Sequence, residues 1–564
     1  MKRNALFYGD NLDVLRGRDA DGRPLIRDES VDLIYLDPPF NSASNYNVLF
    51  KAPDGKASDS QIEAFEDTWH WTDAAARCFQ DVVTGHHQRA GTLLKAMRDA
   101  LGENDMMAYL AMMAARLVEL HRVLKPTGSL YLHCDPTASH YLKLLLDGIF
   151  GPENFRNEIV WKRTSAHSSA KRWGPVHDVL LFYGKQGGTT RWNQIYQPYD
   201  QSYIDEFYTH YDADGRRWRR SDLTGAGTRN GETGQVWRGI DVTAKGRHWA
   251  HPPNVLDQLD TAGRVHWPAK SGGMPMLKRY LDEQRGQPLQ DVIIDIPPMH
   301  NLAEERLGYP TQKPVALLER IIAASSNADD VVLDPFCGCG TTVHAAQKLG
   351  RRWIGIDVTH LAISLIERRM KDAFPDSFDA HGKPVPGVRF DVHGVPRDLD
   401  AARDLAARDK HQFQWWAVSL VEAVPQGGSK KGADRGIDGI RWVKTGPRPE
   451  DVDRIIVSVK GGKVGVGDLR DLAGTVIREK ALAGLLITLE KPTKEMIREA
   501  ASHGYASYGL GDVRRLMVKT VDELLRNVHD EKEVLPPLGR QEGFRRAARE
   551  RPATTRSDQP TLAL

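Results

Sequence analysis

The sequence predicts an α/β protein with a mostly parallel, Rossmann-like sheet, followed by a smaller α/β domain. Short apolar runs that end at an acid alternate with stretches of helical apolar spacing, which is the pattern of strands and helices in a parallel sheet. One apolar run, residues 331–334, continues into a glycine-rich turn and a helix. With 564 residues, the chain exceeds what one hydrophobic core usually holds, so we expect two or three domains.

Composition narrows the class of protein. The 77 basic and 75 acidic residues nearly balance, so any basic surface that binds nucleic acid must be local. The four cysteines (Cys78, Cys134, Cys337 and Cys339) have neither the number nor the spacing of a disulfide framework or a zinc site. No apolar run approaches the roughly 20 residues that span a bilayer, and the N-terminus lacks the apolar core of a signal peptide. We therefore expect a reduced, cytoplasmic protein without a membrane partner.

The first two strands each end at an acid. Ala5–Tyr8 is followed by Asp10, whose ordinary use would be to cap the next helix. The run Leu33–Leu36 stops at Asp37-Pro38-Pro39-Phe40. The two prolines remove backbone donors, so an acceptor-rich pocket remains, and this pocket complements an amino group. The ring of Phe40 offers a face on which a planar base can stack.

The chain continues as alternating helices and strands, which implies a parallel sheet. The predicted elements are a helix over Asn104–Leu124, a strand over Ser129–His133, a helix over Tyr141–Ile149 and a strand over Val179–Tyr183. His133 lies at a strand end, and we interpret it as a structural histidine.

Residues 184–299 depart from this pattern, because arginines are interleaved with aromatic residues. An ordinary core does not need that mixture, whereas a surface that contacts phosphates and bases does. The alternative is an exposed face whose arginines cover aromatic rings. The candidate DNA-binding residues are Arg217, Trp218, Arg219, Arg220, Arg238, Lys245 and Arg247.

A second informative stretch begins at Tyr309-Pro310-Thr311-Gln312-Lys313-Pro314 and continues with a helix over Val315–Ala324. The strand Val331–Asp334 then leads into Pro335-Phe336-Cys337-Gly338-Cys339-Gly340 and a helix over Val343–Leu349. Glycines at such a turn let backbone approach a ligand at a helix N-terminus. The next strand, Trp353–Asp357, ends in an acid at the distance where a ribose hydroxyl would be bonded.

These motifs, in this order, resemble the β class of amino-group DNA methyltransferases that use S-adenosylmethionine. The resemblance covers residues 1 to about 375: the part with the Asp-Pro-Pro-Phe motif (1–183), a target-recognition region (184–299) and a cofactor-binding part (300–375). It implies that Asp37, Pro38, Pro39 and Phe40 are catalytic. It also implies a cofactor site made of Asp10, Thr311, Gln312, Lys313, Asp334, Phe336, Gly338, Gly340 and Asp357.

The family mechanism is compatible with the acceptor-rich pocket. Hydrogen bonds from an exocyclic amine to Asp37 and the Pro38 carbonyl favour the nitrogen geometry that attacks a sulfonium methyl, and no metal is needed. The substrate would be double-stranded DNA with the target base flipped onto Phe40. Asp at the head of the motif favours adenine N6, with cytosine N4 as the alternative. Cytosine C5 chemistry would need a Pro-Cys dipeptide, which the sequence lacks. The aspartate and the long basic insertion disfavour RNA or protein glutamine as substrate. The sequence does not give the oligomeric state, and a homodimer stays open.

The remainder predicts a linker over 376–408, a domain over 409–530 and a disordered tail over 540–564. A helix over His411–Val424 and a strand over Ile455–Lys460 flank Gly436-Ile437-Asp438-Gly439. This domain resembles the Mrr-type restriction endonucleases, which implies that Asp438 binds Mg²⁺ and Lys460 positions water or phosphate. Ser458 stands where that family has Glu or Gln, so more of the coordination would rest on Asp438 and Glu422. Cleavage of DNA, binding without cleavage and a purely structural domain all stay open.

Overall fold

The computed structural model describes residues 3–39, 45–51, 57–66, 70–164, 171, 173–269, 273–300, 303, 305–307, 309, 311–374, 390–426, 436–448, 451–526, 535–537, 547, 548 and 550, with backbone alone over 45–51 and 57–66. Within these residues, no helix combines the length and apolar character that crossing a bilayer requires.

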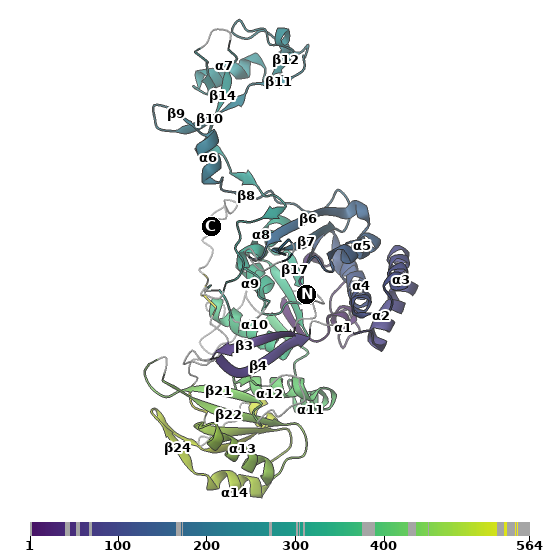
Figure 1. Ribbon diagram of the computed structural model, residues 1–564, viewed down its shortest axis with the longest axis vertical. Coiled ribbons are helices and arrows are strands. Elements are labelled where there is room, and N and C mark those ends of the chain that lie inside the picture. The colour runs from purple at the N-terminus through teal and green to yellow at the C-terminus, as the bar shows by residue number, and fades with distance from the viewer. Residues whose placement is uncertain are drawn as a thin grey trace. The chain divides into compact units, whose positions relative to one another are not determined.

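A nine-stranded sheet forms the centre of the largest domain (Figure 1). Its strands are β1 (Asn4–Tyr8), β2 (Val31–Leu36), β5 (Leu124–Cys134), β6 (Phe155–Lys162), β7 (His177–Gly184), β16 (Val292–Ile293), β17 (Val331–Asp334), β18 (Arg352–Asp357) and β19 (Phe390–His393). The spatial order is β16-β6-β7-β5-β2-β17-β18-β1-β19. Only β7 runs antiparallel to its neighbours, so the predicted mostly parallel sheet is confirmed.

Helices cover both faces of this sheet. They are α1 (Asn11–Arg16), α2 (Asp73–Thr84), α3 (Gln88–Leu101), α4 (Asp105–Val123), α5 (Ser139–Phe150), α8 (Val315–Ser325), α9 (Thr341–Lys348) and α10 (His360–Ala373). The same part of the chain contains a 3-10 turn over Pro152–Asn154 and a hairpin of β3 (Asn45–Lys51) and β4 (Ala57–Glu66). Ile34 and Leu36 of β2 pack into one core with α4 and α5, and Leu33 and Tyr35 pack into a second core with α8 and α9. All six residues of β2 are buried, because the strand is covered on both faces.

Gln194–Gln290 form a compact unit of their own, narrower than the expected range 184–299. Its elements are β8 (Tyr196–Gln197), α6 (Gln201–Phe207), β9 (His210–Tyr211), β10 (Arg217–Asp222), β11 (Thr224–Ala226), β12 (Arg247–Trp249), α7 (Pro253–Thr261), β13 (Val265–His266), β14 (Met276–Tyr280), β15 (Gln287–Pro288) and 3-10 turns over Glu232–Gly234, Thr243–Lys245 and Leu281–Glu283. A four-stranded sheet, β13-β14-β10-β9, lies beside a small core that includes Trp237 and Trp249.

The C-terminal region contains a separate five-stranded sheet, in the order β20-β21-β22-β23-β26. The elements are α11 (Leu399–Arg408), α12 (Lys410–Ser419), β20 (Val424–Pro425), β21 (Gly439–Lys444), β22 (Val452–Lys460), α13 (Val466–Arg478), β23 (Ala483–Thr488), α14 (Lys494–Ser502), β24 (Tyr505–Tyr508), β25 (Gly511–Arg514), β26 (Leu516–Thr520) and α15 (Val521–Leu525). This sheet, with its helices, is the second α/β domain that the sequence predicts.

Two predictions for the C-terminal part need correction. The expected linker, 376–408, contains β19, which pairs with β1, and α11. The helix expected over His411–Val424 ends at Ser419, because Glu422 adopts a positive φ of 52°, which a helix does not accommodate. The tail expected to be disordered lies outside the described residues except for 547, 548 and 550; there the backbone N–H of Glu550 donates to the carbonyl of Ala373 at 2.7 Å, and its carboxylate lies 2.9 Å from Nε2 of His344.

Candidate active site

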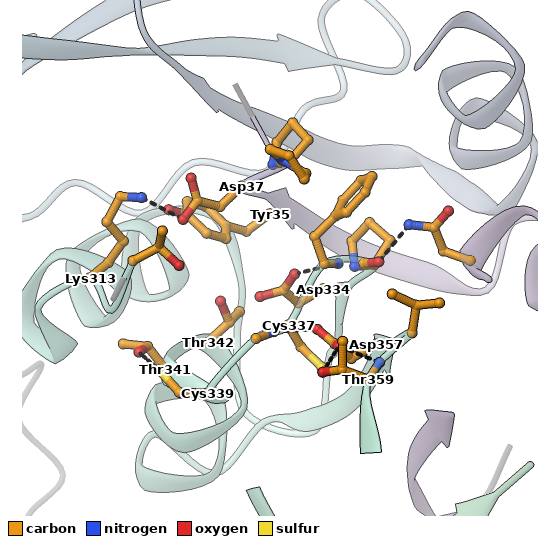
Figure 2. Close-up of a pocket in the computed structure, with 18 of the residues that line it drawn as sticks. Tyr35, Asp37, Lys313, Asp334, Cys337, Cys339, Thr341, Thr342, Asp357 and Thr359 are labelled. Atoms are coloured by element: carbon orange, nitrogen blue, oxygen red, sulfur yellow. Dashed lines mark hydrogen bonds and ion pairs between the residues drawn. The ribbon is translucent and has the colours of Figure 1, made fainter. Parts of the chain in front are cut away.

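Four neighbouring strands carry acids at their carboxyl ends, and these acids open into one cavity of about 320 Å³. Asp37 follows β2, Asp334 ends β17, Asp357 ends β18 and Asp10 follows β1. The strands are parallel and adjacent, so their ends lie side by side. The predicted site residues that line the cavity are Asp10, Asp37, Pro38, Pro39, Thr311, Gln312, Lys313, Asp334, Phe336, Gly338 and Asp357 (Figure 2).

The glycine turn requires glycine at both predicted positions. Gly338 has φ of 48° and Gly340 has φ of 75°, in the left-handed region that other residues rarely adopt. A Cβ at Gly340 would also come within 2.6 Å of Ile366, and one at Gly338 within 3.3 Å of the ring of Tyr309. Gly340 precedes α9 and does not line the cavity. Its role is to shape the turn that exposes the backbone of Gly338.

Asp357 holds this turn in place. Its Oδ2 accepts a hydrogen bond from the backbone N–H of Gly338 at 2.9 Å, and its Oδ1 accepts from the N–H and the hydroxyl of Thr359 at 2.9 and 2.8 Å. Burial raises the pKa of Asp357 to about 6 although these donors lower it. The two donors of Thr359 use both lone pairs of Oδ1, whereas Oδ2 has a further lone pair that a ribose hydroxyl could use.

Asp334 is the most deeply placed acid of the cavity. Its side chain is 4% exposed, and its Oδ1 accepts from the N–H of Phe336 at 3.0 Å. Burial, and to a lesser degree the charges of Asp37 and Asp357, raise the pKa of Asp334 to about 7. Within the described residues, the cavity is thus lined by four carboxylates and by two cations, Arg116 and Lys313.

Asp10 combines the capping role with a place at the cavity. Its Oδ1 accepts from the N–H of Leu12 at 2.7 Å, as expected for a helix cap, and its Oδ2 accepts from Arg116 at 2.7 Å. The buried Arg116 also donates to Asn11, whose amide donates to the carbonyl of Pro335 at 2.7 Å. This chain of bonds joins the end of β1 to the turn after β17. Neither Arg116 nor Asn11 carries a local sequence signal.

Asp37 forms an ion pair that the sequence does not reveal. Its Oδ2 lies 2.5 Å from Nζ of Lys313, and both side chains are mostly buried. Lys313 precedes Pro314, the residue before α8. The neighbouring Gln312 uses its side chain within its own loop, where it accepts from the N–H of Leu307 at 2.7 Å and donates to the carbonyl of Glu305 at 2.6 Å. Gln312 therefore shapes the loop that carries Lys313.

A buried polar network lies behind Asp37. The hydroxyl of Tyr35 is 2.8 Å from Nδ1 of His133, and Nε2 of His133 is 3.2 Å from Asp178. All three are at most 2% exposed. Burial alone would raise the pKa of Asp178, but the hydrogen bond with His133 and the charges of His133, Lys313 and Arg163 hold it below its usual value. His133 is thus satisfied by two partners, in agreement with the interpretation of a structural histidine.

Phe40 and the loop over 41–44 lie outside the described residues, so the stacking role of Phe40 stays a prediction.

Most candidate DNA-binding arginines of the unit 194–290 face acids of the same unit. Arg217 pairs with Asp205 at 3.0 Å, Arg238 with Asp260 at 3.0 Å, and Arg247 with Asp222 at 3.6 Å. Trp218 is buried and stacks on His210, with ring centroids 4.5 Å apart. Lys245 lies 3.4 Å from the sulfur of Met274.

Strands β10 and β14 place positively charged residues directly opposite one another. Arg219 lies directly opposite Arg279, and Arg220 directly opposite Lys278. Like charges at opposite positions destabilise a strand pair unless an anion compensates them. Lys278 has a partner in Asp212 at 2.8 Å, but Arg220 and Arg279 are exposed and have no ion pair within the described residues. Arg279 was not among the residues predicted from the sequence.

In the C-terminal domain, the expected metal ligands serve other purposes. Asp438 accepts from the N–H of Val459 at 2.7 Å and lies 3.3 Å from the hydroxyl of Ser458. Glu422 lies 3.4 Å from Arg441, and Lys460 lies 3.6 Å from Asp468. Among the described residues, no group of three or more His, Cys, Asp or Glu side chains could hold a metal ion. These residues do not fit a Mg²⁺ site.

Comparison with known proteins identifies the family. A family model described as DNA methylase matches residues 31–368, more than half of the chain. The chain belongs to the DNA methylase family. Its large domain accordingly has the fold of an S-adenosylmethionine-dependent methyltransferase.

The relatives are methyltransferases of restriction-modification systems and related enzymes. The Type II methyltransferase M.EcaI of Enterobacter cloacae is 30% identical over 367 residues, which are 65% of this chain and 69% of the relative. The Type III restriction-modification enzyme StyLTI Mod subunit of Salmonella typhimurium is 29% identical over 361 residues, 61% of this chain and 50% of the relative. The DNA adenine methyltransferase YhdJ of Escherichia coli is 24% identical over 366 residues, 65% of this chain and 82% of the relative.

A second family model matches residues 423–526 and is described as NACHT-associated inactive Restriction Endonuclease 1. The expected endonuclease-like domain is therefore present, and its family is one named as inactive, whereas the Mrr type was predicted. The match agrees with the unsuitable geometry around Asp438.

Proposed function

We propose that the protein transfers the methyl group of S-adenosylmethionine to the exocyclic N6 of an adenine in double-stranded DNA, within a restriction-modification or related system. One observation carries the proposal: the carboxylate of Asp37 and the glycine turn at Gly338 line the same cavity. An acceptor for an amine and a backbone cradle for a nucleoside are what amine methylation must bring together.

The cavity has the chemistry that S-adenosylmethionine needs. When bound, this cofactor supplies a methyl group on a positively charged sulfonium. Asp334 and Asp357 place carboxylates at the cavity, and burial, more than the neighbouring acids, raises the pKa of Asp334 to about 7, so a cation bound there would favour its ionised form. The turn at Gly338 has no side chain to obstruct an approaching ligand. Asp357 would accept from the ribose hydroxyls, and Asp10 would lie toward the adenine ring.

Asp37 and Pro38 would activate the target amine. The lone pair of an exocyclic amine is delocalised into the base, so the nitrogen is a weak nucleophile. Hydrogen bonds donated by the amine to Asp37 and to the carbonyl of Pro38 favour the geometry in which the lone pair can attack. Stacked bases do not expose this amine to a cavity, so the target base must be flipped out of the duplex. The relative named a DNA adenine methyltransferase supports adenine, and cytosine N4 is the alternative substrate.

The experiment that tests this function replaces Asp37. We expect Asp37→Ala to abolish transfer of labelled methyl groups to DNA while the dissociation constant for S-adenosylmethionine changes by no more than about threefold, since Asp37 acts on the amine. Asp99→Ala, an exposed carboxylate on α3, is the control and should retain full activity. Sequencing that detects modified bases in DNA from expressing cells would identify the base and the motif. Unchanged transfer by Asp37→Ala would contradict the proposal.

We also propose that the C-terminal domain does not cleave DNA. Asp438 is engaged by the backbone of β22, and Ser458 offers only a hydroxyl where the Mrr-type family has Glu or Gln. The match to a family named as inactive supports this proposal, which replaces the alternative of an enzyme that both methylates and cuts.

A further inference from the structure

Lys313 has a contact that a cofactor-binding residue does not need. Its ammonium lies 2.5 Å from Oδ2 of Asp37, and the two side chains are 12% and 16% exposed. The residues are 276 positions apart in the chain, so the fold itself brings them together. In the close-up, Lys313 extends toward Asp37 at one side of the cavity, away from Asp357 (Figure 2).

Hydrogen bonds of the surrounding loop and a nearby acid hold Lys313 in position. Gln312 ties its own loop to the backbone at Leu307 and Glu305. The carboxylate of Glu305 accepts from the N–H of Val315 at 3.1 Å, which anchors the first turn of α8 directly after Lys313. The buried Asp178 adds a second negative charge near the ammonium, since Lys313 contributes to its lowered pKa. A flexible lysine is thus held in one place.

The ion pair with Lys313 engages only one of the two carboxylate oxygens of Asp37. An ammonium can only donate hydrogen bonds, so Lys313 cannot accept a proton from the target amine. It occupies Oδ2, and within the described residues no hydrogen bond reaches Oδ1 of Asp37. Oδ1 therefore stays available as an acceptor for the amine. Without the ammonium, the carboxylate would be able to rotate about its Cβ–Cγ bond, which is a soft torsion.

We propose that Lys313 is a positioning residue for the methylation reaction: it holds the carboxylate of Asp37 so that one oxygen faces the target amine. This inference rests on the proposed function. It assigns to Lys313 an effect on the chemical step, where the sequence predicted a part in cofactor binding.

The test compares Lys313→Met, Lys313→Arg and Lys313→Ala in the full-length protein. DNA from cells that lack the protein serves as substrate, and calorimetry gives the dissociation constant for S-adenosylmethionine. We expect Lys313→Met to lower kcat by about 100-fold, the loss that a small misplacement of a reacting group causes. The dissociation constant for the cofactor and the melting temperature should stay close to those of the wild type. Lys313→Arg keeps the charge and should retain more activity than Lys313→Met.

Chemical rescue separates positioning from a structural role. Lys313→Ala leaves space beside Oδ2 of Asp37, and methylammonium should restore part of kcat in a saturable manner. Tetramethylammonium has the same charge but no N–H donor, and it should restore nothing. Lys143→Met removes a lysine that pairs with Asp147 at 2.8 Å on α5, outside the cavity, and should leave kcat unchanged.

The possible failures can be told apart. If the wild type transfers no methyl group to DNA, the proposed function is wrong. If the wild type is active and Lys313→Met mainly weakens cofactor binding, Lys313 binds the cofactor and the positioning role is wrong. An active Lys313→Met enzyme with normal kcat, or a loss that follows from unfolding and that methylammonium does not reverse, would also overturn the inference.

Discussion

Two aspartates of the cavity, the buried Asp334 and the half-buried Asp357, have raised pKa values. Burial is the largest cause that raises the pKa of Asp334 to about 7 and of Asp357 to about 6, whereas an exposed aspartate titrates near pH 4. The folded protein therefore binds these protons more tightly than the unfolded chain does. The stability that they contribute is fully present below about pH 4 and is lost as the pH rises through 6 to 7.

Asp334→Asn tests this linkage in the cofactor-free protein. Asparagine keeps an oxygen for the N–H of Phe336 but cannot ionise, so at pH 8 we expect the variant to melt at a higher temperature than the wild type. The advantage should shrink toward pH 5, by about 1.4 kcal/mol per pH unit over the range in which one proton differs. Melting curves at pH 5, 6.5 and 8 measure it, with Asp99→Asn as the control. A difference between variant and wild type that does not depend on pH would refute the linkage.

The sequence could predict residues whose signal is local. Asp37, Asp334 and Asp357 each end a short apolar run, and the parallel sheet then aligns those ends, so all three line the cavity. Their partners carry no such signal. The contact of Asp37 with Lys313 arises because β2 lies beside β17 while α8 packs next to them, and no periodicity reports a pairing over 276 residues.

At the scale of elements, long buried strands and helices were easier to predict than marginal ones. The apolar spacing predicted a helix over Asn104–Leu124, and α4 spans Asp105–Val123 with Asn104 as its cap. The strand β19 was missed because it has only four residues and pairs at the edge of the sheet. In α11, charged residues dilute the apolar stripe of Ala402, Leu405 and Ala406, so a helix was mistaken for a linker.

Composition could not predict which arginines of the unit 194–290 form ion pairs within the unit. Six basic residues were chosen because they lie near aromatic ones, but composition does not say which arginines face an acid. Arg238 and Arg247 form exposed ion pairs within the unit. Arg220 and Arg279, on the paired strands β10 and β14, are exposed and have no ion pair within the described residues, so both can contact phosphate.

This distinction predicts different salt dependences for DNA binding. Each phosphate contact adds about 0.9 to the slope of the logarithm of affinity against the logarithm of salt concentration. We expect Arg220→Gln and Arg279→Gln each to lower this slope by about one. Arg238→Gln should leave the slope unchanged and cost at most about 1 kcal/mol of stability, as exposed ion pairs do. Fluorescence anisotropy between 50 and 200 mM salt gives the slopes. Equal slopes in all four proteins would mean that phosphates bind elsewhere.

At the scale of the whole molecule, a methyltransferase domain and an endonuclease-like domain share one chain, and within the described residues only the first has a site suited to a reaction. The methyltransferase cavity keeps its acids around an open space. In the C-terminal domain, Asp438, the acid that was expected to bind a metal, accepts a hydrogen bond from the backbone of β22. Its contribution is then to the fold of the domain.

The last prediction concerns this domain in the full-length protein. Plasmid DNA should stay uncut with Mg²⁺ or Mn²⁺, with and without S-adenosylmethionine, and neither metal should raise the melting temperature. Asp438→Asn should lower stability by about 1–3 kcal/mol, because a charged acceptor for the N–H of Val459 is replaced by a neutral one. Asp471→Asn, an exposed residue of α13, is the matched control. Metal-dependent cleavage that disappears in Asp438→Asn would show that Asp438 is a metal ligand and that the domain is a nuclease. A hydrogen bond to Val459 that is only structural does not require a metal.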